Sequence, residues 1–184
     1  MENRTKDLIA DQLEILVAEG DFEKVRIKEL CRRCGIERAT FYYHFHDKYD
    51  LVAWIFDREF AQASLEARGS EPVATFAATF ERLAGRRDFW RKVFADRSRY
   101  SISCYLQTFN VSYGRDAVLQ LTGAKVLSEA RLLSIQHTSF GNIGCTIDWL
   151  FGKTPLSPLQ FAELLVGAMP DFLREALAFR LEKR

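Results

Sequence analysis

The stretch "GIERATFYYHFHDKYDL", residues 35–51, decides how the rest of the sequence is interpreted. Aromatic rings and imidazoles fill all six positions from Phe41 to His46, and charges of both signs surround them. Such a run could be protein core, a metal or catalytic cluster, or a surface that contacts a partner. The periodicity of the flanking segments separates these alternatives.

The segments around this stretch have helical period. A first helix is predicted to end before Gly20, and its apolar residues recur at helical spacing: Ile9, Leu13, Leu16 and Val17. A short helix follows over about 27–34, residues 35–37 break it, and a second short helix covers about 38–45. Asp47 is a suitable N-cap for a long helix after it. Two short helices joined at a glycine-containing turn and braced by a longer helix describe a helix-turn-helix unit.

The second short helix has one inward and one outward face. Phe41 and Phe45 lie one turn apart and define a narrow inward stripe. The remaining arc carries an arginine, a threonine, two tyrosines and a histidine. Hydroxyl and imidazole donors suit phosphate oxygens, and an arginine can reach a base edge, so this face suits a major groove of DNA.

The segment "IKELCRRCGIERATFYYHFHDKYDL", residues 27–51, resembles the DNA-binding region of the TetR family of one-component bacterial regulators. Its positions in register with the family pattern are Leu30, Cys31, Cys34, Gly35, Ile36, Thr40, Phe41, Tyr42, His44, Phe45, Lys48 and Leu51. The resemblance covers about residues 5–55. The run "TFYYHFHDKYDLVAWIF", residues 40–56, is also similar to the subgroup that includes regulators associated with dihydroxyacetone kinase operons.

The resemblance implies a role for each matching position. Arg38 and Ala39 take the places that touch bases, and Thr40 could contact a base or a phosphate. The phosphate-contacting places are those of Tyr42, Tyr43, His44 and Lys48. Arg26 and Lys28 are added as DNA-binding residues because of their charge and their position at the start of the preceding helix.

Two positions depart from the family pattern. Glu37 stands where serine is common, and Arg26 stands where threonine is common. An anion near phosphates lowers affinity for DNA unless Glu37 reads a cytosine amino group or pairs with Arg38 or Arg33. A reading in which DNA binding is weak or lost therefore stays open.

Charge is unevenly distributed along the chain. The whole sequence has a formal net charge of +1. Residues 1–25 hold three Lys or Arg against seven Asp or Glu, a net of −4, whereas residues 26–48 hold six against three, a net of +3. Positive charge is therefore concentrated around the quoted stretch, although a solvated helix face would account for it as well.

The rest of the chain also has helical period, and no segment alternates as a strand does. We expect an all-α protein with a helix-turn-helix domain over 1–48 packed on a helical domain over 49–184. Helices are predicted over about 73–84, 87–97, 100–121, 124–136 and 138–151. A last helix starts at Pro158 with Ser157 as its cap, and Pro170 should kink or interrupt it.

Aromatic residues in the larger part could line a ligand pocket, since ligand sites are mostly apolar with a few polar groups. The candidates are Trp54, Phe76, Phe80, Trp90, Phe94, Tyr100, Cys104, Tyr105, Phe109 and His137. The alternative for each aromatic is ordinary core, because an aromatic stripe at helical spacing is usually core. His137, if not in a polar pocket, would lie on a helix surface.

The family resemblance implies a two-fold dimer through the last two long helices, and the sequence supports it independently. The final helix is apolar on two faces, of which a monomer can bury only one. The candidate interface residues are Phe140, Ile143, Gly144, Ile147, Phe151, Phe161, Leu165, Ala168 and Phe172. Glycines on the helix over 138–151 would allow a partner helix to approach closely.

Other chemistries fit the sequence poorly. Cys31, Cys34, His44 and His46 have C-x2-C-x9-H-x-H spacing, which is not that of a zinc finger, and the four cysteines are interpreted as reduced, buried small residues. There is no glycine-rich phosphate loop, H-E-x-x-H motif or nucleophile elbow. We therefore expect no catalytic residue, metal or cofactor. No signal-peptide core or membrane-spanning run occurs, so a cytoplasmic protein without a membrane partner is expected.

Together these features predict a homodimeric transcriptional regulator, a repressor, that binds a palindromic double-stranded DNA operator and responds to an unknown small-molecule effector. The alternative is a TetR-like dimeric small-molecule-binding co-regulator with weak or no DNA binding of its own.

Overall fold

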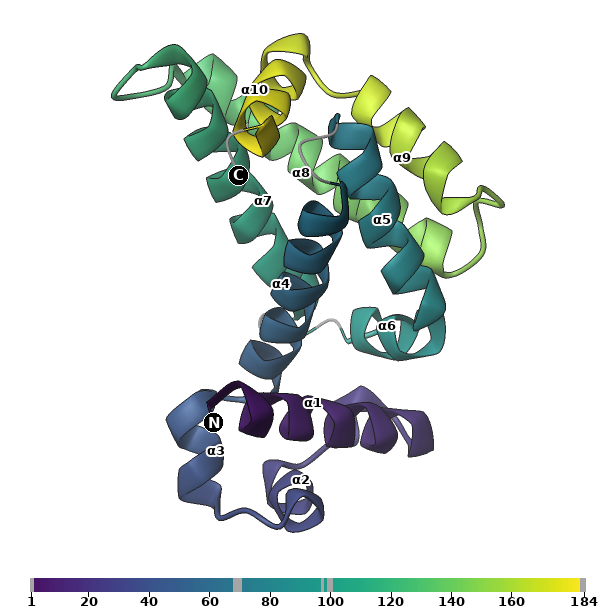
Figure 1. Ribbon diagram of the computed structural model, residues 1–184. Coiled ribbons are helices and arrows are strands. Elements are labelled where there is room, and N and C mark those ends of the chain that lie inside the picture. The colour runs from purple at the N-terminus through teal and green to yellow at the C-terminus, as the bar shows by residue number, and fades with distance from the viewer. Residues whose placement is uncertain (1, 68–70, 97, 99–100, 183–184) are drawn as a thin grey trace.

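The computed structural model describes residues 2–67, 71–96, 98 and 101–182, and this part of the chain is all-helical, without a strand (Figure 1). The N-terminal unit comprises α1 (Glu2–Glu19), the 3-10 helix η1 (Phe22–Lys24), α2 (Ile27–Cys34) and α3 (Arg38–His44). In Figure 1 these elements form the lower end of the molecule, with α1 lying above α2 and α3. The predicted pair of short helices is present at the predicted positions.

The turn between α2 and α3 depends on Gly35. This residue ends α2 in the left-handed conformation, with φ of 64°, where a side chain would be strained. The N–H of Ile36 then donates to the carbonyl of Cys31 at 3.1 Å and closes the end of the helix. This closure sets the direction in which α3 leaves.

Helix α4 (Lys48–Ala67) connects the N-terminal unit with the larger upper part (Figure 1). Its start is capped as predicted, because Asp47 Oδ1 accepts hydrogen bonds from the backbone N–H groups of Tyr49 at 2.8 Å and Asp50 at 2.9 Å. An apolar core runs along α4 and joins the two parts.

The upper part consists of six further helices. They are α5 (Pro72–Gly85), α6 (Arg87–Phe94), α7 (Ile102–Thr122), α8 (Glu129–Leu150), α9 (Pro158–Gly167) and α10 (Asp171–Glu182). Helix α5 packs mainly against α4 and α9, and α7 packs mainly against α8 and α10. Short α6 contacts both α1 and α8, so it lies between the N-terminal unit and the upper part.

The helix boundaries in the upper part differ from the prediction at one place. The two helices predicted over 124–136 and 138–151 are a single helix, α8, because no glycine or proline interrupts the chain near His137 and Ser128 caps a later start. At α9 the prediction is confirmed, since Ser157 and Gln160 form a reciprocal capping box. Pro170 lies in the break between α9 and α10.

None of the described helices combines the length and the apolar character that a bilayer crossing requires.

Candidate nucleic-acid interface and internal cavity

Helix α3 presents its two faces as the sequence predicts. Phe41 is 0% exposed and Phe45 is buried beside it, with their ring centroids 5.8 Å apart. Tyr43, in contrast, is 76% exposed, and Tyr42 is also exposed. Two phenylalanines therefore fix the helix to the core while the tyrosines face solvent.

Arg38 lies on this outward face, one turn before Tyr42. Its Nη2 is 3.4 Å from the Tyr42 hydroxyl, and its guanidinium carbon is 5.8 Å from the centre of that ring. Arg38 and Ala39 are both exposed at the start of α3, and Thr40 is half-buried. An arginine supported by an aromatic ring is pre-ordered for contact with a planar acceptor such as a guanine edge.

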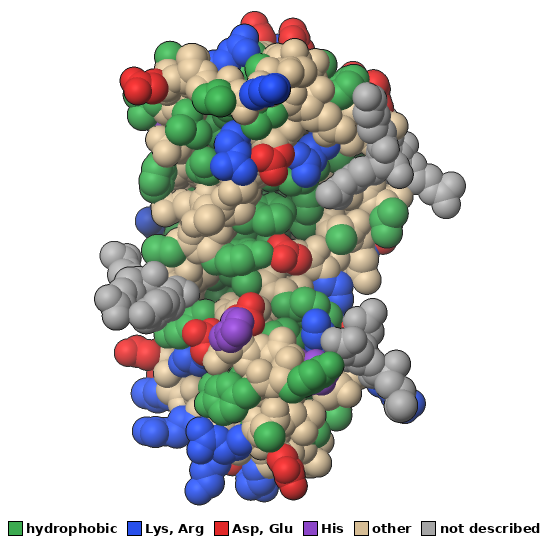
Figure 2. Space-filling view, turned by 90° about the vertical axis from the view of Figure 1, so that its left-hand side faces the viewer, with side chains coloured by type: hydrophobic (Ala, Val, Ile, Leu, Met, Phe, Trp, Pro, Cys, Tyr) green, Lys and Arg blue, Asp and Glu red, His purple; other side chains and the backbone are tan. Residues whose placement is uncertain are grey.

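The cations of the N-terminal unit fall into two groups. Arg33 is held by Glu19 at 2.6 Å and Glu29 at 3.1 Å, and Arg32 binds Glu29 at 2.7 Å. These two arginines lower the pKa of Glu29 to about 2 through their hydrogen bonds. Arg26 and Lys28, together with Arg38, are exposed and take part in no ion pair among the described residues. Figure 2 shows Lys and Arg side chains gathered at this lower end of the molecule.

Lys48 does not face solvent as a phosphate-binding lysine would. Its Nζ donates to the backbone carbonyls of Phe22 at 2.8 Å, Glu23 at 2.7 Å and Val25 at 3.4 Å, and burial lowers its pKa. The three donors of the ammonium group are thus directed at η1 and the residue after it. The predicted phosphate contact is replaced by a structural one that ties η1 to the start of α4.

The surroundings of His44 and Glu37 also differ from those expected of residues that contact DNA. His44 is half-buried, its Nδ1 is enclosed without a hydrogen-bond partner, and its ring packs edge-on to Tyr43 with centroids 4.9 Å apart. Glu37 is exposed at the N-cap of α3 but makes no capping hydrogen bond with its side chain. Within the described ranges, no ion pair joins Glu37 to Arg38 or Arg33.

The cysteine pair of α2 packs against α1. Cys31 is buried, and Cys34 is half-buried with its Sγ 3.9 Å from the carbonyl oxygen of Leu8. Burial raises the pKa of Cys34 to about 11, which disfavours the thiolate that metal binding requires. No cluster of three potential metal ligands occurs in the part of the chain that the structure describes. Cys104 and Cys145 are exposed, so the expectation that all four cysteines are buried is wrong.

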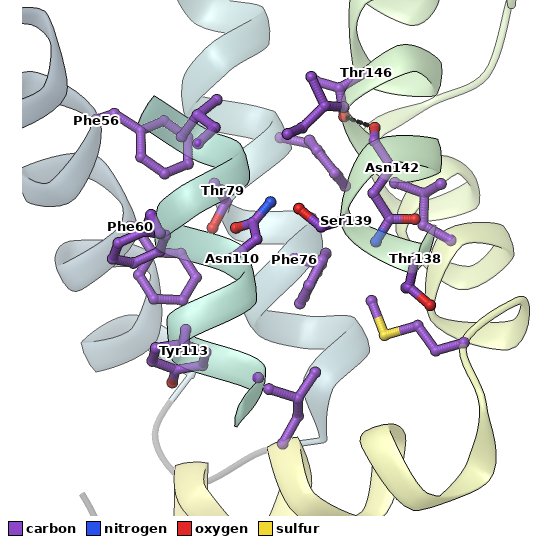
Figure 3. Close-up of a pocket in the computed structure, with 18 of the residues that line it drawn as sticks. Phe56, Phe60, Phe76, Thr79, Asn110, Tyr113, Thr138, Ser139, Asn142 and Thr146 are labelled. Carbon is purple, nitrogen blue, oxygen red and sulfur yellow. Dashed lines mark hydrogen bonds between the residues drawn. The ribbon is translucent and has the colours of Figure 1, made fainter. Parts of the chain in front are cut away.

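A cavity of about 110 Å³, partly open to solvent, lies among the helices of the upper part of the molecule (Figure 3). One side is aromatic, with Phe56 and Phe60 from α4 and Phe109 from α7. The opposite side in Figure 3 is polar and comes from α8. The polar residues that line the cavity are Thr79, Asn110, Tyr113, Thr138, Ser139, Asn142 and Thr146.

Comparison with known proteins identifies the N-terminal unit. Residues 9–55 match the family described as bacterial regulatory proteins, tetR family. The N-terminal unit therefore carries the helix-turn-helix region of the TetR family. The match takes in α2, α3 and the outward face of α3, which the sequence predicts as the DNA-binding surface.

Two known proteins are similar to this chain over different lengths. The HTH-type dhaKLM operon transcriptional activator DhaS of Lactococcus lactis subsp. lactis (strain IL1403) is 28% identical over 58 residues, which is 32% of this chain and 31% of that protein. The chain thus matches about a third of the length of this relative.

A solved structure of a dihydroxyacetone kinase operon activator DhaS superposes with a TM-score of 0.60, covering 90% of this chain and 93% of that chain at 15% identity. This second likeness shows a shared fold. The relatives support the predicted subgroup, and they are regulators of transcription rather than enzymes.

The cavity includes only part of the predicted pocket. Phe76, Phe80, Phe94 and Phe109 line it. Trp90 is fully buried in solid core, Trp54 packs edge-on to Phe45, and Tyr105 donates a hydrogen bond to Asp57 at 2.8 Å. Cys104 and His137 are exposed. Tyr100 lies outside the described residues. The polar lining residues were missed, although hydroxyl and amide residues recur every fourth position over 138–146.

The residues predicted for the dimer interface also differ in their exposure. Ile143, Phe161 and Leu165 are buried within the subunit, where they contribute to the core or the cavity wall, so their assignment to the interface is corrected. Ile147 and Phe172 are half-buried. Phe140, Gly144, Phe151 and Ala168 remain exposed. The exposed apolar residues of α8 and α9 that the prediction omitted are Leu133, Leu159 and Leu164.

Proposed function

We propose that this protein is a ligand-responsive regulator of transcription that binds double-stranded DNA as a homodimer. The observation that carries the proposal is the outward face of α3, where Arg38, Tyr42 and Tyr43 are exposed on a helix anchored by buried Phe41 and Phe45. A packed helix with exposed donors is what a major groove requires.

The proposed contacts with DNA use the exposed residues of the N-terminal unit. Helix α3 lies in the major groove, where Arg38 and Ala39 meet base edges and the tyrosines meet phosphates. Arg26 and Lys28 contact the backbone from the start of α2. Lys48 acts indirectly, because it holds η1 in place rather than binding a phosphate.

Homodimerisation is supported by an exposed apolar surface on α8 and α9. Leu164 is 60% exposed, and Leu133 and Phe140 are exposed on α8. A Cβ atom added at Gly141 or Gly144 would meet open space, so a partner helix can approach there. Two copies joined through this surface would carry two α3 helices to a palindromic operator.

The dimer is tested by sedimentation. Leu164→Glu places a charge in the proposed interface and should yield monomers. Leu65→Glu changes a comparably exposed leucine of α4 and should leave the assembly unchanged. A Leu164→Glu protein that sediments as the unaltered chain does would refute this interface.

Response to an effector is supported by the contacts of α6. Arg87 and Arg91 donate to the last carbonyls of α8 at 2.5–3.2 Å, and Lys92 donates to the carbonyls of Val17 at 2.8 Å and Ala18 at 3.0 Å. Cations at the C-terminal ends of two helices thus join α8, which lines the cavity, to α1, which braces the DNA-binding unit. A shift of α8 would be passed to α1.

A reporter-gene assay would show whether the protein represses or activates transcription. The sequence predicts a repressor, whereas the similar proteins named above are described as activators of a dhaKLM or dihydroxyacetone kinase operon. Deletion of the gene should raise expression from its operator if the protein represses and lower it if the protein activates.

A second function, a co-regulator with weak or no DNA binding, is favoured by one observation. Glu37 is exposed beside Arg38 without a cation bound to it among the described residues. A carboxylate so close to DNA phosphates opposes binding unless it meets a donor on a base.

Fluorescence anisotropy with the DNA upstream of the gene separates the two functions. Arg38→Ala should lose about 1–3 kcal/mol of binding free energy for the operator and little for a scrambled duplex. Arg32→Ala is the matched control, because Arg32 is exposed but paired with Glu29 on α2. Equal, weak binding of both duplexes by the unaltered protein would favour the co-regulator.

A further inference from the structure

We infer that the internal cavity binds a small uncharged molecule with an apolar body and a hydroxyl group at one edge, a molecule of about the size of phenol. The inference rests on the proposed function, because it specifies the chemical class of the effector.

The volume of the cavity limits the size of the ligand. Its 110 Å³ is somewhat less than the roughly 150 Å³ of an engineered protein cavity that binds benzene. A single six-membered ring with one small substituent therefore fills it after minor adjustment of the walls. A second fused ring would require large side chains to move.

The lining excludes a charged ligand. Within the described part of the chain, no Asp, Glu, Lys, Arg or His lines the cavity. A carboxylate or phosphate moved there from water would lose its hydration without gaining a counter-charge, which is prohibitively costly. Glu59, the nearby buried carboxylate of α4, is already bound by Arg82 at 3.0 Å and Arg86 at 2.9 Å.

The polar side of the cavity calls for a hydroxyl group. The hydroxyls of Thr138 and Thr146 donate to carbonyls of their own helix, at 2.9 Å and 2.7 Å, and so can only accept from a ligand. The side-chain amides of Asn142 and Asn110 are half-buried and make no hydrogen bond to other described residues. They offer both donors and acceptors to the cavity, and a hydroxyl group can satisfy both at once.

The aromatic side of the cavity suits an apolar, flat body. Phe109 meets Phe56 and Phe60 edge-on, with ring centroids 6.2 Å and 5.7 Å apart. Such rings pack well against another ring and cannot hydrogen-bond a second polar edge. A polyol would leave hydroxyl groups unpaired against these phenylalanines.

Isothermal titration calorimetry of the full chain with five probes tests this class. Phenol should bind, and benzene should bind about tenfold more weakly because it leaves the two amides unpaired. Benzoate should not bind because it is charged, and glycerol should not bind because it has no apolar body. 2-Naphthol should not bind because of its second ring. Binding of benzoate or glycerol in preference to phenol would overturn the inference, and so would failure of phenol to bind.

Substitution of the polar side tests the assigned groups. Asn142→Leu keeps the approximate volume and removes the hydrogen-bonding amide, so it should weaken phenol binding about tenfold and leave benzene binding equal or stronger. Thr108→Val is the matched control, because Thr108 is exposed on α7. Asn110→Leu, on a different helix, gives the same test if Asn142→Leu does not fold. Unchanged phenol affinity in a folded variant would refute the assignment.

Anisotropy with operator DNA on the same preparations distinguishes this inference from the proposed function. A protein that binds the operator but not phenol would overturn the effector class alone. A protein that binds phenol but no duplex would overturn DNA regulation and leave the cavity assignment intact.

Discussion

The surface of α3 and the internal cavity use similar side chains in opposite directions. On α3, phenylalanines point inward into solid packing and tyrosine hydroxyls point outward. Around the cavity, phenylalanines surround unfilled space, and hydroxyl and amide groups point inward with them (Figure 3). A surface that binds a large rigid partner needs exposed hydrogen-bond donors on a rigid scaffold. A site for a small ligand needs space that the protein leaves unfilled.

The largest expected effect comes from shortening one phenylalanine in each region. Phe41→Ala opens a void in solid core and should lower the free energy of unfolding by about 3–5 kcal/mol. Phe76→Ala removes a half-buried ring from the cavity wall, where fewer neighbours are lost, and should cost at least about 1 kcal/mol less. Urea unfolding of both variants measures the difference.

Equal losses for Phe41→Ala and Phe76→Ala would break the comparison, because they would mean that the cavity wall is packed as tightly as the anchor of α3.

The next effect concerns Lys48, which the sequence predicts as a phosphate contact and the structure places against η1. Lys48→Met should lower the free energy of unfolding by about 1–3 kcal/mol, since it removes the hydrogen bonds of the ammonium group to the carbonyls of η1. DNA binding should weaken for all sequences with no change in its salt dependence. If the slope of log affinity against log salt concentration fell by about 1 while stability stayed unchanged, Lys48 would be a phosphate contact as the sequence predicts.

A smaller effect is expected at the most exposed tyrosine. Tyr43→Ala should change the free energy of unfolding by less than about 0.5 kcal/mol, because the ring packs little, and should weaken operator binding by about 0.5–1.5 kcal/mol. Thermal unfolding and anisotropy on one preparation supply both numbers. A loss of stability larger than the loss of affinity would mean that Tyr43 belongs to the scaffold.

The smallest effect lies at the junction of the two regions, where Asp57 of α4 accepts a hydrogen bond from Tyr105 of α7. Burial raises the pKa of Asp57 above 3.8, so the folded state holds the proton more tightly than the unfolded state does. Its contribution to stability is therefore present at low pH and is lost as the pH rises through the raised pKa. Asp57→Asn should remove this loss and be at least as stable at pH 7, by less than about 1 kcal/mol. Unfolding curves at pH 4 and pH 7 check the sign, and a less stable variant at pH 7 would show that the charge itself is needed.

The N-terminal unit could be predicted from the sequence because its signals are continuous. Gly35, the inward pair Phe41 and Phe45, and the cap Asp47 all fall within a dozen or so residues, and each acts on its own helix. The role of Lys48 could not be predicted in this way. It depends on the carbonyls of η1, which precede it by more than twenty residues and are brought beside it only by the fold.

The cavity was less predictable because it is assembled from separate helices. Asn110 comes from α7 and Asn142 from α8, and an asparagine is not unusual on a helix surface. Aromatic content alone could not separate Phe109, which lines the cavity, from Trp90, which fills solid core. The one local signal was the recurrence of Thr138, Asn142 and Thr146 at every fourth position on one face of α8.

The most direct test of DNA binding through α3 is a titration of the protein with its upstream DNA and with a scrambled duplex, followed by anisotropy at 50 mM and 200 mM salt. We expect the upstream duplex to bind at least about a thousandfold more tightly at either salt concentration, with affinity for both duplexes falling steeply as salt rises. Indistinguishable affinities for the two duplexes, or binding that does not respond to salt, would contradict the account.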